Sequence, residues 1–260
     1  MKSENSPETI VSIERALIIL KRLASANGEV GVRGLSRELG YSSAVTQKTL
    51  NTLKLHDFVQ QNPATGRYSL GFGTVRIGLA MLDRLDVVRV ANPQMEALTT
   101  VTGETTFLAI RDGLSGVYIS KVRSPNAIRM DAEIGSNRPL NCTAVGKTLL
   151  AWAPPELISE MIQAEAFVKA TEKSIVDPEV LEAQLVKVRE LGYALDLREF
   201  HNEAICVAAP IFDPSGDVVA SITISGVASR MESRLEEYAK LVIEKSNVIS
   251  KTLGYKGDRF

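Results

Sequence analysis

Residues 42–58 read SSAVTQKTLNTLKLHDF, and this stretch decides the fold of the first part of the chain. Val45, Leu50 and Leu53 recur at helical spacing and predict a helix with one buried face. The opposite face is polar, and its only charged side chains are lysines, since the sequence has no acidic residue between positions 42 and 55. A helix face of this kind suits the base edges and phosphates of DNA.

The flanking residues extend this helix into a small domain within the first seventy residues. Residues 12–31, SIERALIILKRLASANGEVG, predict a first helix, and residues 32–40, VRGLSRELG, predict a shorter second helix that ends at a glycine. FVQQ and RYSL, joined by the turn NPATG, read as a hairpin after the third helix. This order of elements is that of a winged helix-turn-helix. The core face of the first helix is expected to carry Ile13, Leu17, Leu20 and Leu23.

The polar side chains of this domain supply candidate DNA contacts. Amide side chains can pair with adenine and lysines with guanine or phosphate, while arginines on the second helix and at the hairpin tip suit the DNA backbone or the minor groove. Residues 1–70 carry a net charge of +3 and the remainder −4, which agrees with a basic head. From the residues alone, a small helical domain with a merely solvated polar face is the alternative. The candidates are Arg33, Arg37, Ser42, Ser43, Gln47, Lys48, Asn51, Lys54 and Arg67.

The composition fits a globular protein of one large domain or two smaller ones: 260 residues, 45% hydrophobic and 23% charged. Two cysteines do not make a disulfide framework, and no apolar run approaches the roughly 18–20 residues of a membrane span. The polar start, MKSENSPETI, lacks the apolar core of a signal peptide. We expect a cytoplasmic protein without membrane contact, with a flexible N-terminus at residues 1–9.

Dispersed segments along nearly the whole chain together resemble the IclR family of bacterial transcriptional regulators. They are SIERALIILKRLA, GLSRELG, TLNTLKLHDFVQQNPATGRYSLG, LAIRDGLSGVYISKV, IRMDAEIGSNRPLNCTAVGKTLLAW, GYALDLRE and CVAAPIFDPSGDVVASITISG. The resemblance implies an α+β protein with a winged helix-turn-helix at residues 10–72. A linker helix and a PAS/GAF-like effector-binding domain with an antiparallel sheet are implied at residues 73–260. It also implies homodimers, or dimers of dimers, on palindromic double-stranded operator DNA.

The second part of the chain is compatible with that domain. Strands are predicted at residues 105–110, 116–122, 127–133, 204–212 and 218–225. Helices are predicted at residues 70–85, 87–103, 144–153, 155–163, 178–191 and 231–253.

Two positions of the third helix depart from the usual family pattern. Gln47 stands at a position that is usually tyrosine, and Lys48 at one that is usually arginine. We therefore expect DNA binding to persist with a different operator sequence. Ahead of Cys206, Glu203 replaces a usual glycine, which leaves the turn before that strand open.

Residues 146–148, Gly-Lys-Thr, resemble the end of a phosphate-binding loop, but position 141 is asparagine where that loop needs glycine. Half of a motif does not indicate a nucleotide hydrolase. In the family resemblance, TAVGK begins a helix beside the effector pocket. A helix start offers unpaired N–H groups and a positive dipole end, which favour a small anion. Lys147 is then expected at the surface.

The resemblance implies eight effector-binding positions. Thr223 and Ser225 are two apart on one predicted strand, so their hydroxyls face the same side. Gly146 is expected to let a ligand or a neighbouring strand approach closely, and Met130 is expected on a strand that lines the pocket. The eight positions are Met130, Ala144, Val145, Gly146, Asp196, Cys206, Thr223 and Ser225.

The expected effector is a small organic acid. An ionised Asp196 would repel a carboxylate unless it accepts a hydrogen bond from a ligand hydroxyl or is itself protonated. This favours a sugar acid, a hydroxy acid or a hydroxylated aromatic acid. The residues alone leave other roles open: Asp196 could bond a loop amide, Cys206 could be a small buried apolar residue, and Cys142 could line the pocket. Glu199 could be a surface charge or a supporting partner.

The sequence does not favour an enzyme. Its two histidines, His56 and His201, lie in the predicted DNA-binding head and in a charged loop, so a catalytic triad has little to build from. CxxC, HExxH and calcium-loop motifs are missing, so we expect no metal and no cofactor. We predict a repressor or activator of a catabolic operon whose operator affinity responds to the acid. The alternative is a ligand-sensing or dimerisation module whose helix-turn-helix contacts protein.

Overall fold

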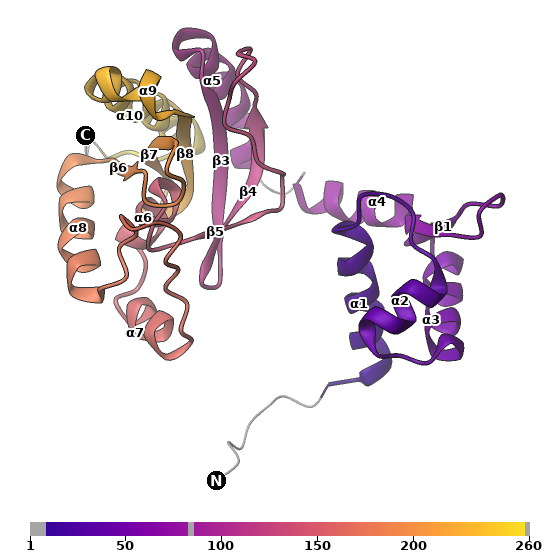
Figure 1. Cartoon of the computed structure of the whole chain (residues 1–260). Coiled ribbons are helices and arrows are strands. Elements are labelled where there is room, and N and C mark those ends of the chain that lie inside the picture. Colours follow the sequence, from indigo (N-terminus) through magenta and orange to yellow (C-terminus); the bar gives the residue numbers. More distant parts are fainter. Residues whose placement is uncertain (1–8, 83–85, 258–260) are drawn as a thin grey trace. The chain divides into compact units, whose positions relative to one another are not determined.

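The computed structural model of the chain describes residues 9–82 and 86–257. The chain divides into two compact units, residues 1–84 and 85–260, each with its own apolar core (Figure 1). The predicted flexible segment at residues 1–9 lies, except for residue 9, outside the described residues. None of the helices in the described ranges could serve as a membrane span.

The N-terminal unit is the predicted winged helix-turn-helix. It consists of α1 Val11–Ala24, α2 Val32–Leu39, α3 Ser43–Leu55, β1 Val59–Gln61, β2 Tyr68–Leu70 and α4 Phe72–Leu82. Gly40 ends α2 in the left-handed conformation, with φ of 70°, that glycine adopts readily. Ser42 begins α3 by accepting a hydrogen bond from the Val45 amide at 3.3 Å. These two residues make the tight turn between the helices.

The buried face of α1 is the predicted one only in part, since Leu23 is buried and Leu20 packs against the core as expected. Ile19 is fully buried, whereas Ile13 and Leu17 are 55% and 53% exposed. Both sides of α1 are apolar, so helical spacing alone does not select the side that packs inward. On α3, Val45 is only half-buried, and Thr46 takes the fully buried position.

The C-terminal unit has the predicted architecture, an antiparallel sheet with helices against it. Its six strands have the order β5-β4-β3-β8-β7-β6, and every neighbouring pair is antiparallel. The strands are β3 Thr105–Asp112, β4 Ser115–Val122, β5 Asn137–Pro139, β6 Ala194–Leu197, β7 Ala204–Phe212 and β8 Val218–Val227. The helices are α5 Asp86–Thr102, α6 Ala144–Ala151, α7 Glu156–Gln163, α8 Pro178–Leu191, α9 Ala228–Met231, the 3-10 turn η1 Glu232–Arg234 and α10 Leu235–Leu253.

Successive side chains of each strand face opposite sides of this sheet. Phe107 packs with Val145 of α6 in one apolar cluster, and it pairs with Thr223 across β3 and β8. Thr223 therefore lies on the α6 side. The hydroxyl of Thr99 on α5 donates to Thr106 at 2.9 Å, so α5 covers the other side of β3.

The strand predicted at residues 127–133 is not formed. Residues 123–136 connect β4 to β5 without forming a strand, and two of their carbonyls accept hydrogen bonds from side chains of the sheet. Thr105 donates to the Met130 carbonyl at 2.7 Å, and Lys121 donates to the Ala132 carbonyl at 2.6 Å. Met130 thus lies on a loop. The apolar alternation of this segment imitates a strand, but β4 pairs with β5.

The first turn of α6 packs directly on the chain that leaves β5. Thr143 caps α6 by accepting a hydrogen bond from the Gly146 amide at 2.9 Å, and its hydroxyl donates to the Pro139 carbonyl at 2.7 Å. A Cβ atom on Gly146 would lie 2.3 Å from the Pro139 oxygen and 2.6 Å from the Leu140 Cα. The neighbouring backbone, not a ligand, therefore requires glycine at this position.

Gly146→Ala is expected to destabilise the C-terminal unit by about 1–3 kcal/mol, because the new methyl group forces the two backbones apart. Urea unfolding followed by circular dichroism measures the loss. Gly34→Ala on α2 is the control, since its Cβ would meet only Val30, at 3.9 Å. Helix propensity then predicts a gain of about 0.5–1 kcal/mol. A Gly146→Ala protein as stable as the parent would contradict the close contact.

Candidate functional site

The exposed side of α3 carries most of the candidate DNA contacts. Lys48, Asn51 and Lys54 are exposed along the helix, and Ser42 and Ser43 are exposed at its start. The arginines on α2 and in the hairpin turn are exposed as well: Arg33, Arg37 and Arg67. This surface is free to approach a charged groove.

Gln47 is half-buried, and its side chain is held in place. Its Nε2 donates to Asn51 Oδ1 and to the Tyr68 hydroxyl, each at 2.9 Å. Both amide hydrogens are thereby used, which leaves the Gln47 oxygen and the Asn51 amide hydrogens for a base edge. Lys54 donates to Gln61 Oε1 at 3.1 Å and links α3 to β1, as Gln47 links α3 to Tyr68 of β2.

Glu29 organises the hairpin turn, a role that the sequence analysis missed. Its carboxylate accepts hydrogen bonds from Asn62 Nδ2 at 2.7 Å and from the Thr65 hydroxyl at 2.9 Å. These bonds, with the nearby charge of Arg67, hold the pKa of the Glu29 carboxyl below its usual range. Glu29, in the segment between α1 and α2, therefore holds the hairpin turn that carries Arg67.

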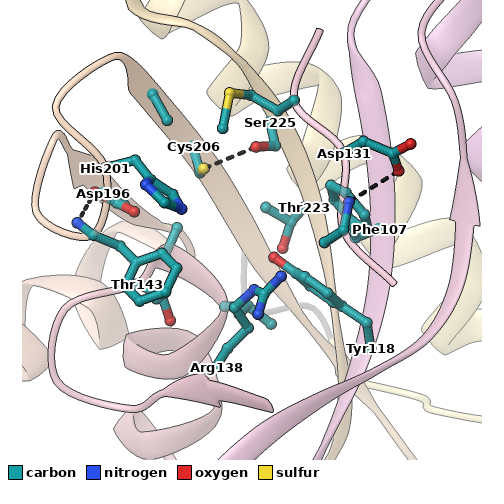
Figure 2. A pocket seen from close by; sticks show the side chains of 16 residues that line it. Phe107, Tyr118, Asp131, Arg138, Thr143, Asp196, His201, Cys206, Thr223 and Ser225 are labelled. Carbon is teal, nitrogen blue, oxygen red and sulfur yellow. Dashed lines mark hydrogen bonds between the residues drawn. The ribbon is translucent and has the colours of Figure 1, made fainter. Parts of the chain in front are cut away.

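A cavity lies on the α6 side of the sheet, between β3, β8, the first turn of α6 and the 123–136 loop (Figure 2). Its volume is about 50 Å³, roughly three to five water-sized volumes. Seven of the eight predicted effector positions line it: Met130, Ala144, Val145, Asp196, Cys206, Thr223 and Ser225. Gly146 does not, since its amide is bound by Thr143 and its Cα faces the chain after β5.

The hydroxyl groups of β8 face the cavity as predicted, but they differ in their partners. Ser225 Oγ lies 3.1 Å from Cys206 Sγ, its neighbour on β7. Thr223 is 1% exposed, and its hydroxyl has no hydrogen-bond partner among the described residues. Burial raises the pKa of the Cys206 thiol, so it is a protonated wall residue and not a nucleophile. Cys142 is buried elsewhere and does not line the cavity.

Asp196 both lines the cavity and bonds loop amides. Its Oδ1 accepts hydrogen bonds from the amides of Glu199 at 2.7 Å and Phe200 at 3.4 Å. Burial raises the pKa of its carboxyl to about 7, and the nearby Glu199 charge adds to the rise. Near neutral pH this carboxyl therefore exchanges between donor and acceptor forms.

Lys147 is not at the surface, so that prediction is wrong. It is 1% exposed, and its ammonium group pairs with Glu199 Oε1 at 2.5 Å and donates to Gln184 Oε1 at 3.1 Å. Glu199 is accordingly a buried partner and not a surface charge. The pair is 52 residues apart in sequence, so no local pattern could have revealed it.

Five residues with polar side chains at the cavity were missed by the sequence analysis: Tyr118, Asp131, Arg138, Thr143 and His201. Tyr118 stacks on Phe107 with ring centroids 4.3 Å apart. Arg138 lies in the quoted segment just before TAVGK, so its position in the sequence was the available signal. No cluster of three or more metal-ligating side chains occurs within the described ranges.

Asp196→Asn is expected to change the pH dependence of thermal stability. The folded-state pKa of about 7 exceeds the ordinary value, so the Asp196 contribution to stability is present at low pH and lost as pH rises through 7. The asparagine variant, which keeps an acceptor for the two loop amides, lacks this loss. Between pH 5 and 8 it should gain about 1–3 kcal/mol relative to the parent. Calorimetric melting curves measure the difference, and parallel curves would contradict the raised pKa.

The comparisons with known proteins cover both units. Residues 79–251 match the family described as "Bacterial transcriptional regulator IclR C-terminal", and residues 12–63 match "IclR helix-turn-helix domain". The chain is 35% identical over 246 residues to the HTH-type transcriptional repressor AllR of Escherichia coli (strain K12), covering 94% of this chain and 91% of AllR.

Solved structures agree with this similarity. The Thermotoga maritima IclR has a TM-score of 0.79 at 33% identity, over 95% of this chain and 100% of that one. An IclR homologue from Microbacterium hydrocarbonoxydans, complexed with 4-hydroxybenzoate, has a TM-score of 0.84 at 20% identity, over 93% and 98% of the two chains. At that identity the second likeness speaks for the fold alone.

Proposed function

The chain belongs to the IclR family and is a DNA-binding transcriptional regulator with a C-terminal effector domain, and from this premise we propose how its two units divide the work. The N-terminal unit reads a palindromic operator with α3. The C-terminal unit binds a small organic acid in the cavity, and occupancy changes operator affinity. Family membership sets aside the alternative of a helix-turn-helix that contacts only protein.

The DNA-binding proposal rests on the exposed face of α3, which has no aspartate or glutamate. Lys48 and Lys54 supply charge, and the bonded pair of Gln47 and Asn51 supplies one acceptor and further donors for a base edge. Two such helices in a dimer would enter successive major grooves about 34 Å apart. The proposed contacts are Arg33, Arg37, Ser42, Ser43, Gln47, Lys48, Asn51, Lys54 and Arg67.

The unpartnered hydroxyl of Thr223 carries the effector proposal. A buried hydroxyl without a hydrogen-bond partner carries a free-energy penalty, and a ligand oxygen that bonds it relieves that penalty. The small volume of the cavity suits a short sugar acid or hydroxy acid better than a hydroxylated aromatic acid. The proposed contacts are Met130, Ala144, Val145, Asp196, Cys206, Thr223 and Ser225.

The N-terminal unit offers a surface for a second copy of the chain. Ile13 and Leu17 on α1 are more than half exposed, as are Phe72 and Ile77 on α4. Monomeric proteins rarely expose so many large apolar side chains in one small domain. We assign this surface to a homodimer, which would present the two α3 helices that a palindromic site requires. A dimer of dimers would use a further interface.

Regulation follows from coupling between the two units. A coupling free energy of about 1–3 kcal/mol would change operator affinity roughly 5- to 150-fold. AllR is a repressor, which supports repression of a catabolic operon in the cytoplasm and release from the operator when the acid binds. The polypeptide between the units, including α4, is the proposed route of the signal. No catalytic role is assigned to either unit.

Lys48→Ala is expected to weaken binding to a duplex selected by the parent protein from a random pool by about 10- to 100-fold. Binding to unselected DNA should change much less, since base recognition is lost and most phosphate contacts remain. Fluorescence anisotropy at several salt concentrations measures both. Lys240→Ala, which removes an exposed cation from α10, is the control and should bind as the parent does. Equal loss on both duplexes would reassign Lys48 to a phosphate.

Leu17→Glu is expected to dissociate the dimer at micromolar concentration, because a buried unpaired carboxylate would replace an apolar contact. Sedimentation velocity measures the oligomeric state. Leu191→Glu, an equally exposed leucine on α8 of the other unit, is the matched control and should leave the dimer intact. A dimeric Leu17→Glu protein would place the interface elsewhere.

A further inference from the structure

Arg138 brings a guanidinium group to the wall of the cavity from β5. The group lies over the Tyr118 ring, 4.6 Å from its centroid, and 5.6 Å from the centroid of Phe200. Its Nη1 also donates to the Asn137 carbonyl at 2.6 Å. Figure 2 shows the guanidinium directed to the same space as the Tyr118 hydroxyl and Thr223. Two rings and a backbone bond therefore hold this cation in one orientation.

The cation has no carboxylate partner within the described parts of the chain, where the ion pairs join other residues. Asp196, which lines the same cavity, gives its Oδ1 to two loop amides, and Asp131 is paired with Lys121 and Arg123. The guanidinium is half-buried and positively charged, and it has more N–H donors than its contacts with Asn137 and Tyr118 use, so it favours an anion. Its fork matches the two oxygens of a carboxylate.

The unpartnered Thr223 hydroxyl is the second, independent sign of a ligand. It is nine-tenths buried or more and faces the cavity that Arg138 lines. One molecule that bonds both groups needs a carboxylate at one end and another oxygen close to it. The helix start is less available than the sequence suggested, because Thr143 already caps the Gly146 amide.

We propose that Arg138 binds the carboxylate of the effector while Thr223 bonds a second oxygen of the same molecule, so that Arg138 makes the site select acids. This assignment rests on the proposed effector function and names the residue that sets its specificity. The small volume of the cavity favours a short acid, and the panel below therefore consists of short acids with an oxygen on the carbon next to the carboxylate.

The test compares acids with their uncharged amides on the full-length protein. Glycolate, lactate, glycerate and pyruvate, each beside its amide, are titrated by isothermal calorimetry into the parent protein. The acid that binds is then titrated into Arg138→Met, Arg138→Lys and Arg129→Met. Arg129 is the matched control, since it is an exposed arginine of the loop before β5 whose Nη1 also donates to a backbone carbonyl, yet it does not line the cavity.

Arg138→Met should lose about 50-fold or more in affinity for the acid with little change for the amide, because a charge-assisted bond is removed. Arg138→Lys, which keeps the charge without the fork, should lose roughly 10-fold. Arg129→Met should bind as the parent does. Circular dichroism tests whether each variant is folded. If Arg138→Met does not fold, the Arg138→Lys variant decides the outcome.

Two results would overturn the assignment, and they are distinct. If the parent binds an acid and the Arg138 variants keep the preference for acid over amide, Arg138 is not the carboxylate site, while the proposed effector function stands. If the parent binds no acid of the panel, the proposed short-acid effector fails and the role of Arg138 fails with it.

Discussion

The contact between two backbones at Gly146 fixes the geometry of the proposed effector site. The first turn of α6 lies so close to the chain leaving β5 that only a hydrogen atom fits between them. As a result, Arg138 of β5 and Ala144 and Val145 of α6 reach the same cavity. Packed interiors hold such contacts in discrete arrangements, so the cation and the helix start are positioned as one unit.

A buried ion pair extends this constraint from α6 to the segment after β6. Lys147 follows Gly146 directly and pairs with Glu199, whose own amide donates to Asp196. In proteins, removing one member of such a pair costs about 3–5 kcal/mol, because the other charge stays buried. The pair therefore links the helix start, the loop and the Asp196 carboxyl, and a ligand that shifts one of them acts on all three.

Local patterns predicted the parts of the molecule that depend on neighbours in sequence. The order of helices and hairpin in the N-terminal unit followed from periodicity and turn residues, and the family resemblance supplied seven of the residues that line the cavity. What failed depends on tertiary contacts. The inward side of α1, the loop at residues 127–133 and the burial of Lys147 are decided by distant partners that no local pattern reveals. Arg138 escaped notice for the same reason, because only the fold brings β5 to the cavity.

The bond between Gln47 and Tyr68 has a consequence for how this regulator meets DNA. Tyr68 is 1% exposed in the core of the N-terminal unit, so its hydroxyl is a fixed point of the fold. The side chain of Gln47 bonds this hydroxyl and Asn51, so it is already held in one rotamer before DNA binds. Ordering a side chain at an interface opposes association by about 0.5–1.5 kcal/mol. For Gln47 this entropy is lost when the protein folds, so it does not oppose DNA binding. If Gln47 contacts DNA as proposed, α3 is preorganised for one pattern of base edges, and a different operator would require Tyr68 of the core to change along with α3.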